Sequence, residues 1–199
     1  MTQWFERARF EWHPDKPREF KVLLGLLGNE TGPMCQTPIT GSFGQLWYGA
    51  AHVRLELGCP VTEAQTGAAA EQIFEHGLMY YWSGTDEIYV LSAGTPDGGE
   101  WWKLPNTWHE GEPLPPLTPP PGLLAPERGF GKVWRENPML QVYLGWARMR
   151  EVGFAGAYQR FQRGVMLYSG DINGHPGRIY VLYDANADPH SAYSETYPD

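Results

Sequence analysis

The chain has 199 residues, of which 42 % are hydrophobic, enough to build the core of one domain or of two small ones. It carries 15 Lys and Arg against 23 Asp and Glu, a net charge of −8, and no basic stripe. This acidic balance opposes binding to nucleic acid and to anionic lipid surfaces, so we expect neither as a partner. No apolar stretch approaches the roughly 18 residues of a transmembrane helix, and no signal peptide is visible.

The first predicted element, residues 1–28, resembles half of a unit that recurs later in the chain. The pattern of residues 3–12 returns without a gap at residues 72–81. Residues 20–23 then take the place of Ile-Tyr-Val-Leu at 88–91. We therefore expect residues 1–28 to be a partial repeat that consists of strands and lacks the helical half.

Cys35 and Cys59 are the two cysteines of the chain. In an oxidising compartment they would form one disulfide, and otherwise they would remain free thiols in the core. The sequence leaves both alternatives open. The two cysteines lack Cys-x-x-Cys spacing and a companion histidine cluster, so we expect no zinc site. We find no motif for another metal or for a cofactor, and we expect neither.

Residues 29–111 are predicted to be the first full repeat, and it opens with a helical pattern. Apolar residues between Phe43 and Leu57 follow the 3-4 spacing that places side chains on one helix face. Residues 49–51 mark a bend, so we expect a pair of short helices. Gly58 follows the last apolar residue, where a helix commonly ends on a residue with positive φ.

Strand patterns follow the helices. Gln72 and Phe74 share one face at period two, Gly77 interrupts this pattern, and Met79 and Tyr81 continue it. A glycine at this point suits the tight turn of a β-hairpin, which requires positive φ. The β-branched and aromatic run at 88–91 supplies a third strand.

The segment from Gly94 to Gly111 holds three tryptophans that do not recur in the second repeat, Trp101, Trp102 and Trp108. They lie among glycine, proline, aspartate and asparagine residues, so we expect a loop. Exposed indole rings can stack on sugar rings or anchor a protein partner, which makes these three the candidate ligand-binding residues. The alternative is that they pack the loop onto the sheet.

Residues 112–127 form a proline-rich segment. Its proline run favours an extended polyproline II conformation and excludes a central strand. We expect a stiff linker or a strap laid over the surface, with a ligand for SH3-type domains as the alternative.

Residues 128–199 are the second full repeat. The pattern between Phe43 and Tyr81 returns between Phe130 and Tyr168 without a gap, and Pro138 suits the first position of its second helix. The predicted fold class is therefore α+β, with tandem repeats. Each repeat is expected to be a kinked pair of short helices followed by a small antiparallel β-hairpin or three-stranded sheet.

Two sequence features resemble known families. Residues 3–14 and 22–28 look like a module of secreted and surface-attached proteins of Chloroflexota-type bacteria. The step Leu57-Gly58-Cys59-Pro60, ahead of Gln-x-Phe-x-x-Gly-x-Met, is similar to the LGFP repeats of bacterial cell-wall-associated proteins. This resemblance implies an envelope-associated repeat module without catalytic residues.

The residues that recur are glycines, aromatics and aliphatics with one glutamine, and they include no constellation of carboxylates, histidines or hydroxyls. A duplication that keeps packing residues alone favours a binding module over an enzyme. We therefore expect a non-catalytic extracellular or cell-envelope module that binds a glycan, peptidoglycan or a protein.

Two alternatives remain. The protein would otherwise be a structural subunit of a surface layer or filament, with self-association as its activity. It would otherwise be a hydrolase that acts on glycosides or cell wall, with a pair of carboxylates as acid and base. The second repeat argues against the hydrolase, because Glu63 and Glu75 are replaced there by Arg150 and Gln162.

Overall fold

The computed structural model describes residues 2–4, 9–12, 22–25, 35–92, 99–170, 176–184 and 193–198. The chain divides into two compact units, residues 1–36 and residues 37–199. In the first unit, strands β1 (Thr2–Trp4), β2 (Arg9–Trp12) and β3 (Val22–Gly25) form an antiparallel sheet in the order β1-β2-β3.

The second unit contains four short helices and eight strands in its described residues. Its first half comprises α2 (Gly41–Gly49), α3 (Ala51–Leu57), β4 (Gln65–Phe74), β5 (Gly77–Trp82), β6 (Glu87–Ser92) and β7 (Gly99–Pro105). Its second half comprises α4 (Arg128–Glu136), α5 (Pro138–Leu144), β8 (Val152–Phe161), β9 (Gly164–Ser169), β10 (Arg178–Tyr183) and β11 (Tyr193–Pro198). The two halves present the same elements in the same order.

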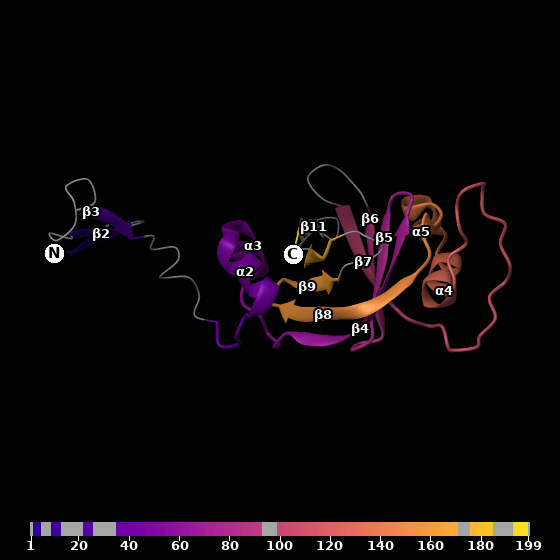
Figure 1. The fold of residues 1–199 in the computed structure, drawn as a ribbon, viewed down its shortest axis with the longest axis horizontal. Helices are drawn as coiled ribbons and strands as arrows, with labels where there is room; N and C mark the ends of the chain where they lie inside the picture. The colour runs from indigo at the N-terminus through magenta and orange to yellow at the C-terminus, as the bar shows by residue number, and fades with distance from the viewer. Residues whose placement is uncertain are drawn as a thin grey trace. The chain divides into compact units, whose positions relative to one another are not determined.

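The eight strands close into one antiparallel barrel, with the order β10-β11-β7-β6-β5-β4-β8-β9. The predicted fold class, tandem repeats that each carry their own small sheet, is therefore wrong. Each half supplies a four-stranded meander, and the two meanders join along both edges (Figure 1). The helix pairs α2–α3 and α4–α5 lie at opposite ends of the barrel in that view.

The barrel forms because both faces of each meander are apolar. On β5, Met79 belongs to a buried cluster shared with α4 and α5, and its neighbour Tyr80 belongs to a second cluster built from strands of both halves. On β6, Ile88 and Tyr89 divide between the clusters in the same way. A separate three-stranded sheet would expose the second cluster to water, and closure of the barrel buries it.

The seam between β4 and β8 is symmetric about the duplication. Seven residue pairs join the two strands, and at their centre Ala68 pairs with Ala155, its own counterpart in the second half. Gln65 pairs with Tyr158 at one end of the seam, and Glu71 pairs with Val152 at the other. Val152 is the counterpart of Gln65 and Tyr158 is the counterpart of Glu71, so the two ends are equivalent positions of the duplication. The two halves are therefore related by a pseudo-twofold axis at the Ala68–Ala155 pair.

The predicted helix ends and hairpin turns are confirmed. Pro138 occupies the start of α5, and Gly58 and Gly145 end α3 and α5 with φ of 71° and 68°. The hairpin glycines Gly77 and Gly164 have φ of 153° and 154°.

Two kinds of recurring polar side chain tie the helices and loops to the barrel. The Nε1 atoms of Trp47 and Trp134 donate hydrogen bonds of 3.0 Å and 2.9 Å to the carbonyls of Gly58 and Gly145. The recurring glutamine acts similarly, since Nε2 of Gln72 donates to the Met149 carbonyl at 3.0 Å. These bonds satisfy buried backbone groups, which explains why the residues recur.

Cys35 and Cys59 form a disulfide, so of the two alternatives left open by the sequence the bridge is confirmed. The bridge closes the segment that carries α2 and α3. Among the described residues, no helix has the length and apolar character needed to cross a membrane.

Candidate functional site

Two of the three candidate tryptophans lie in a strand. The segment predicted as a loop contains β7, although its residues 94–98 lie outside the described residues. Nε1 of Trp101 donates to the Tyr183 carbonyl at 2.7 Å, and its ring stacks on Tyr89 at a centroid distance of 6.3 Å. The Trp102 ring lies 5.1 Å from that of Tyr143 on α5. Both side chains are partly buried, and they pack β7 against its neighbours.

Trp108 is placed differently, in the segment between β7 and the proline-rich strap. Its backbone N–H donates to Oδ1 of Asn106 at 3.3 Å, and its Nε1 donates to the Glu112 carbonyl at 3.0 Å. Glu112 is held in turn by Nζ of Lys132 on α4, at 2.6 Å. Trp108 is therefore fixed in place at the beginning of the strap, and it remains partly exposed.

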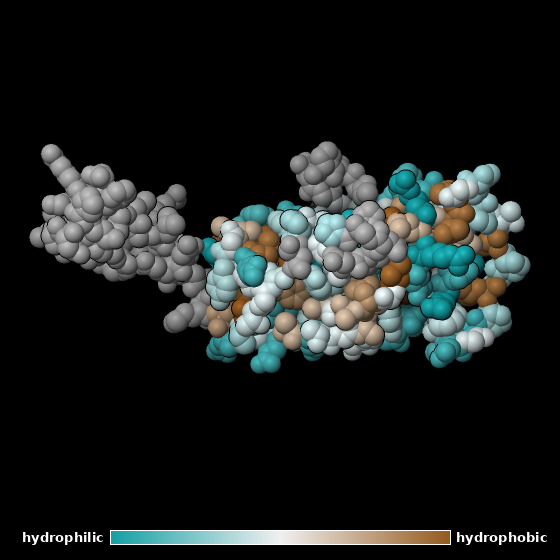
Figure 2. Space-filling view, viewed as in Figure 1, coloured by the Kyte–Doolittle hydropathy of each residue, from teal (hydrophilic) through white to brown (hydrophobic). Residues whose placement is uncertain are grey.

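Three neighbouring hollows meet at Arg128, the first residue of α4, and we call them together the Arg128 site. Their volumes are about 200, 260 and 400 Å³. Glu151 lines the first and second hollows, and Trp108 lines the first and third. The hollows thus form a continuous surface feature beside α4. Figure 2 shows hydrophilic and apolar residues side by side at the end of the barrel that carries α4 and α5.

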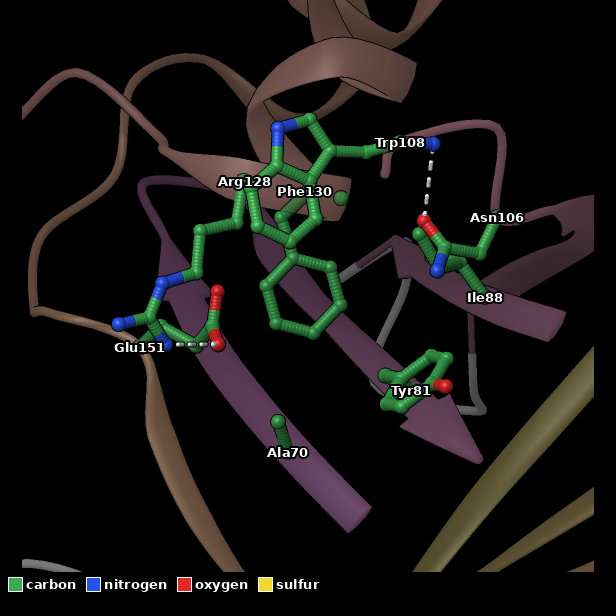
Figure 3. A pocket seen from close by; sticks show the side chains of 9 residues that line it. Ala70, Tyr81, Ile88, Asn106, Trp108, Arg128, Phe130 and Glu151 are labelled. Atoms are coloured by element: carbon green, nitrogen blue, oxygen red, sulfur yellow. Dashed lines mark hydrogen bonds and ion pairs between the residues drawn. The ribbon is translucent and has the colours of Figure 1, made fainter. Parts of the chain in front are cut away.

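The first hollow has an apolar floor and a polar rim (Figure 3). Ala70, Ile88 and Phe130 line it from β4, β6 and α4. On one side of the rim lie Arg128 and Glu151, and on the other lies Asn106. The rim and floor of the first hollow consist of Ala70, Tyr81, Ile88, Asn106, Trp108, Arg128, Gly129, Phe130 and Glu151. A pocket of this size and lining suits one small ring with polar substituents.

Hydrogen bonds hold the polar side of the first hollow that lies opposite Arg128 and Glu151. Nδ2 of Asn106 and the Tyr81 hydroxyl both donate to Oδ1 of Asp86, at 2.9 Å and 3.0 Å. This shared carboxylate holds Asn106, and Asn106 in turn accepts the Trp108 N–H. Burial raises the pKa of the Tyr81 hydroxyl, and its hydrogen bond to Asp86 adds to the increase.

Arg128 and Glu151 form a loose ion pair. Nη1 of Arg128 lies 3.5 Å from Oε1 of Glu151, with the arginine side chain 67 % exposed and the glutamate side chain 21 % exposed. Burial raises the pKa of the Glu151 carboxyl, and the Arg128 charge opposes this increase without cancelling it. The proximity of Glu127 adds to the increase. A surface pair of this length adds little stability.

The first half of the chain serves as an internal reference for this site. Arg128 has φ of 51°, and its counterpart at the start of α2 is Gly41 with φ of 61°. Glycine adopts this left-handed conformation without a steric penalty, whereas arginine pays roughly 1 kcal/mol for it. The counterpart of Glu151 is Ala64. Both members of the charged pair are therefore additions to the duplicated scaffold, and one of them occupies a strained position of the kind that often marks a functional site.

The strap forms one wall of the site. Leu114, Pro115, Pro116 and Leu117 line the third hollow together with Trp108 and Arg135. At the far end of the strap, the Leu124 N–H donates to the Ala147 carbonyl at 2.8 Å. Residues 112–127 are thus attached to the barrel unit at both ends and shape the hollow between them.

We predict that the variant Arg128→Gly is at least as stable as the parent. Glycine removes the steric cost of the left-handed backbone, so the free energy of unfolding should stay unchanged or rise by up to about 1 kcal/mol. Denaturant unfolding followed by circular dichroism measures this change. The matched variant Gly41→Ala places a side chain at the counterpart position and should lower stability by about 1 kcal/mol. A clear loss of stability in Arg128→Gly would contradict a strained Arg128.

The structure combines one predicted candidate with residues that sequence reasoning missed. Trp108 lies at the site, whereas Trp101 and Trp102 take part in packing. Arg128 is not a candidate in the sequence, and Glu151 stands out there only as one of several carboxylates that could serve a hydrolase. The signal that would have found them is the comparison of the two halves, which shows charged residues at 128 and 151 opposite glycine and alanine.

No protein-family model, curated protein or solved structure matches this chain. The resemblance to LGFP repeats therefore remains an expectation from sequence.

Proposed function

We propose that this protein is a non-catalytic extracellular or cell-envelope module that binds a glycan at the Arg128 site. The support is the combination of a fixed indole, an apolar floor and a polar rim around connected hollows. Sugar rings present apolar C–H faces and polar hydroxyl edges, and this combination of surfaces matches both. Three hollows in contact suit successive units of a chain better than a single small molecule.

The observation that carries this proposal is a difference between the two halves of an otherwise symmetric scaffold. The two halves share helices, strands and hairpin glycines, and the charged pair of Arg128 and Glu151 is present in one half alone. Packing requirements are the same in both halves, so they do not account for this pair. A ligand that contacts one end of the barrel does account for it.

The disulfide supports the extracellular location. Bridges such as that between Cys35 and Cys59 persist in oxidising compartments and are rare in reducing ones. Secretion or display on the cell surface is therefore part of the proposal.

Glycan binding is tested by affinity electrophoresis and calorimetry against a panel of soluble polysaccharides and peptidoglycan fragments. We expect Trp108→Ala to weaken binding by roughly 2- to 12-fold, because a stacked aromatic contact contributes about 0.5–1.5 kcal/mol. The matched control is Tyr48→Ala, which removes an aromatic side chain that is 63 % exposed on α2, away from the site. The proposal fails if no glycan binds, or if both variants bind as the parent does.

One observation favours a second candidate function, hydrolysis of a glycosidic bond. Glu127 and Glu151 both line the second hollow, and burial raises the pKa of Glu151. A carboxyl with a raised pKa can protonate a leaving oxygen while a second carboxylate activates water. Release of reducing ends by the parent, and its loss in Glu151→Gln, would favour this candidate over simple binding.

A further inference from the structure

We propose that the ligand of the Arg128 site is an acidic glycan, and that a carboxylate on this glycan displaces Glu151 from the Arg128 guanidinium. This inference rests on the proposed function, since it names the class of glycan that the same site binds. It follows from the donors that Arg128 leaves unused, from the other arginines of the site, and from the environment of Glu151.

Arg128 has most of its hydrogen-bonding capacity free. A guanidinium group carries five N–H donors, and a bidentate pair with a carboxylate uses two of them at shorter distances. The contact with Glu151 is a single one of 3.5 Å, and the Arg128 side chain is 67 % exposed. A carboxylate on a ligand can therefore make a better pair with Arg128 than Glu151 does.

Two further arginines face the same site. Arg150 lines the second hollow and forms no hydrogen bond or ion pair with the residues that the structure describes. Arg135 lines the third hollow, and its Nη1 donates to the carbonyls of Pro126 and Gly131, both at 2.8 Å. These carbonyls fix the orientation of the guanidinium and do not neutralise its charge.

The charge of the site is opposite to that of the chain. Three arginines, at 128, 135 and 150, line the second and third hollows together with three carboxylates, Glu112, Glu127 and Glu151. Lys132 pairs with Glu112, so four cations stand against three carboxylates. The chain as a whole has a net charge of −8. A cationic site on an acidic protein favours an anionic group at that site and opposes non-specific adsorption of anionic polymers elsewhere.

Displacement of Glu151 couples binding to a proton. Burial and Glu127 raise the pKa of the Glu151 carboxyl, and Arg128 on α4 is the cation that opposes them. When a ligand carboxylate pairs with Arg128, the Arg128 charge no longer lowers the pKa of Glu151, and Glu151 binds a proton more readily. Arg150 lies at the same hollow and offers the ligand a second cation. Acidic glycans should therefore bind more tightly as the pH falls from about 7.5 to 5, where their own carboxylates stay ionised.

The experiment compares uronic-acid and lactyl-ether oligosaccharides, each with its neutral methyl ester, by calorimetry between pH 5 and 7.5. We expect the acids to bind at least about 10-fold more tightly than their esters, with proton uptake visible as a dependence on buffer ionisation enthalpy. Arg128→Gln should remove the difference between acid and ester. Glu151→Gln should bind the acids at least as tightly as the parent, without proton uptake and with a flat pH profile.

Other outcomes would contradict the acidic glycan, the displacement of Glu151 or the proposed glycan binding itself. If esters or neutral glycans bind as tightly as the acids, the acidic-glycan inference is overturned and the proposed glycan binding stands. If acids bind more tightly but Glu151→Gln keeps the pH dependence of the parent, the displacement of Glu151 is overturned. If neither acidic nor neutral glycans bind, the proposed function falls together with this inference.

Discussion

Alanine at Gly77 or Gly164 is expected to unfold the barrel. A β-carbon at Gly77 would collide with the Leu91 carbonyl oxygen and approach Cδ2 of Leu144 to 2.8 Å. At Gly164 it would collide with the Leu182 carbonyl oxygen and approach Cδ2 of Leu57 to 2.6 Å. Each collision involves the backbone of a neighbouring strand that cannot move without breaking the ladder. We expect each variant to lose more than about 4 kcal/mol of a total stability of about 5–15 kcal/mol.

Thermal unfolding followed by circular dichroism and by the yield of folded protein measures this loss. Gly49→Ala is the matched control, because a β-carbon there has no neighbour within 4 Å and the residue lies in α2. Its melting temperature should stay near that of the parent. If Gly77→Ala has the same melting temperature as Gly49→Ala, the close packing of β5 against β6 is incorrect.

Loss of the disulfide is expected to have the second-largest effect. The bridge between Cys35 and Cys59 restricts the unfolded chain across the segment that carries α2 and α3. Loops of this length correspond to a stabilisation of about 3 kcal/mol in the chain-entropy account. The double variant Cys35→Ser, Cys59→Ser should therefore unfold at a clearly lower denaturant concentration than the oxidised parent.

The reducing agent supplies the control for this measurement. Reduction should lower the unfolding midpoint of the parent to that of the double variant, and it should leave the double variant unchanged. Equal midpoints for the oxidised parent and the double variant would show that the bridge contributes no stability.

The sequence predicted local elements well because local rules determine them. Apolar spacing between Phe43 and Leu57 marks α2 and α3, and Gly77 marks the hairpin of β4 and β5 because the turn requires positive φ. The strong match between the two halves also predicted that their elements would correspond. None of these signals depends on contacts between the halves.

Closure of the barrel depends on contacts between the two halves, and for that reason the sequence did not predict it. The sequence predicts a separate small sheet for each half, whereas Tyr80 and Tyr89 are buried on the second face by strands of the other half. The fourth strand of each half was also missed. In β7, the pair Trp101–Trp102 lies among glycine and proline, so composition favoured a loop.

The candidate site was hidden from sequence for a different reason. A search for recurring residues finds the scaffold, and Arg128 and Glu151 are the residues that do not recur. Their proximity depends on how the start of α4 packs beside the start of β8, which no spacing in the sequence encodes. Trp108 was found because its aromatic character identifies it without any tertiary information.

The pairing of Ala68 with Ala155 has a consequence for the origin of this architecture. A strand that pairs with its own counterpart makes an isologous contact, the kind by which two identical subunits associate about a twofold axis. One half of the chain thus carries a self-complementary edge, and two separate copies of it have the surfaces needed to assemble as a homodimer. Covalent fusion converts that encounter into an intramolecular one, which frees each copy to diverge without losing its companion.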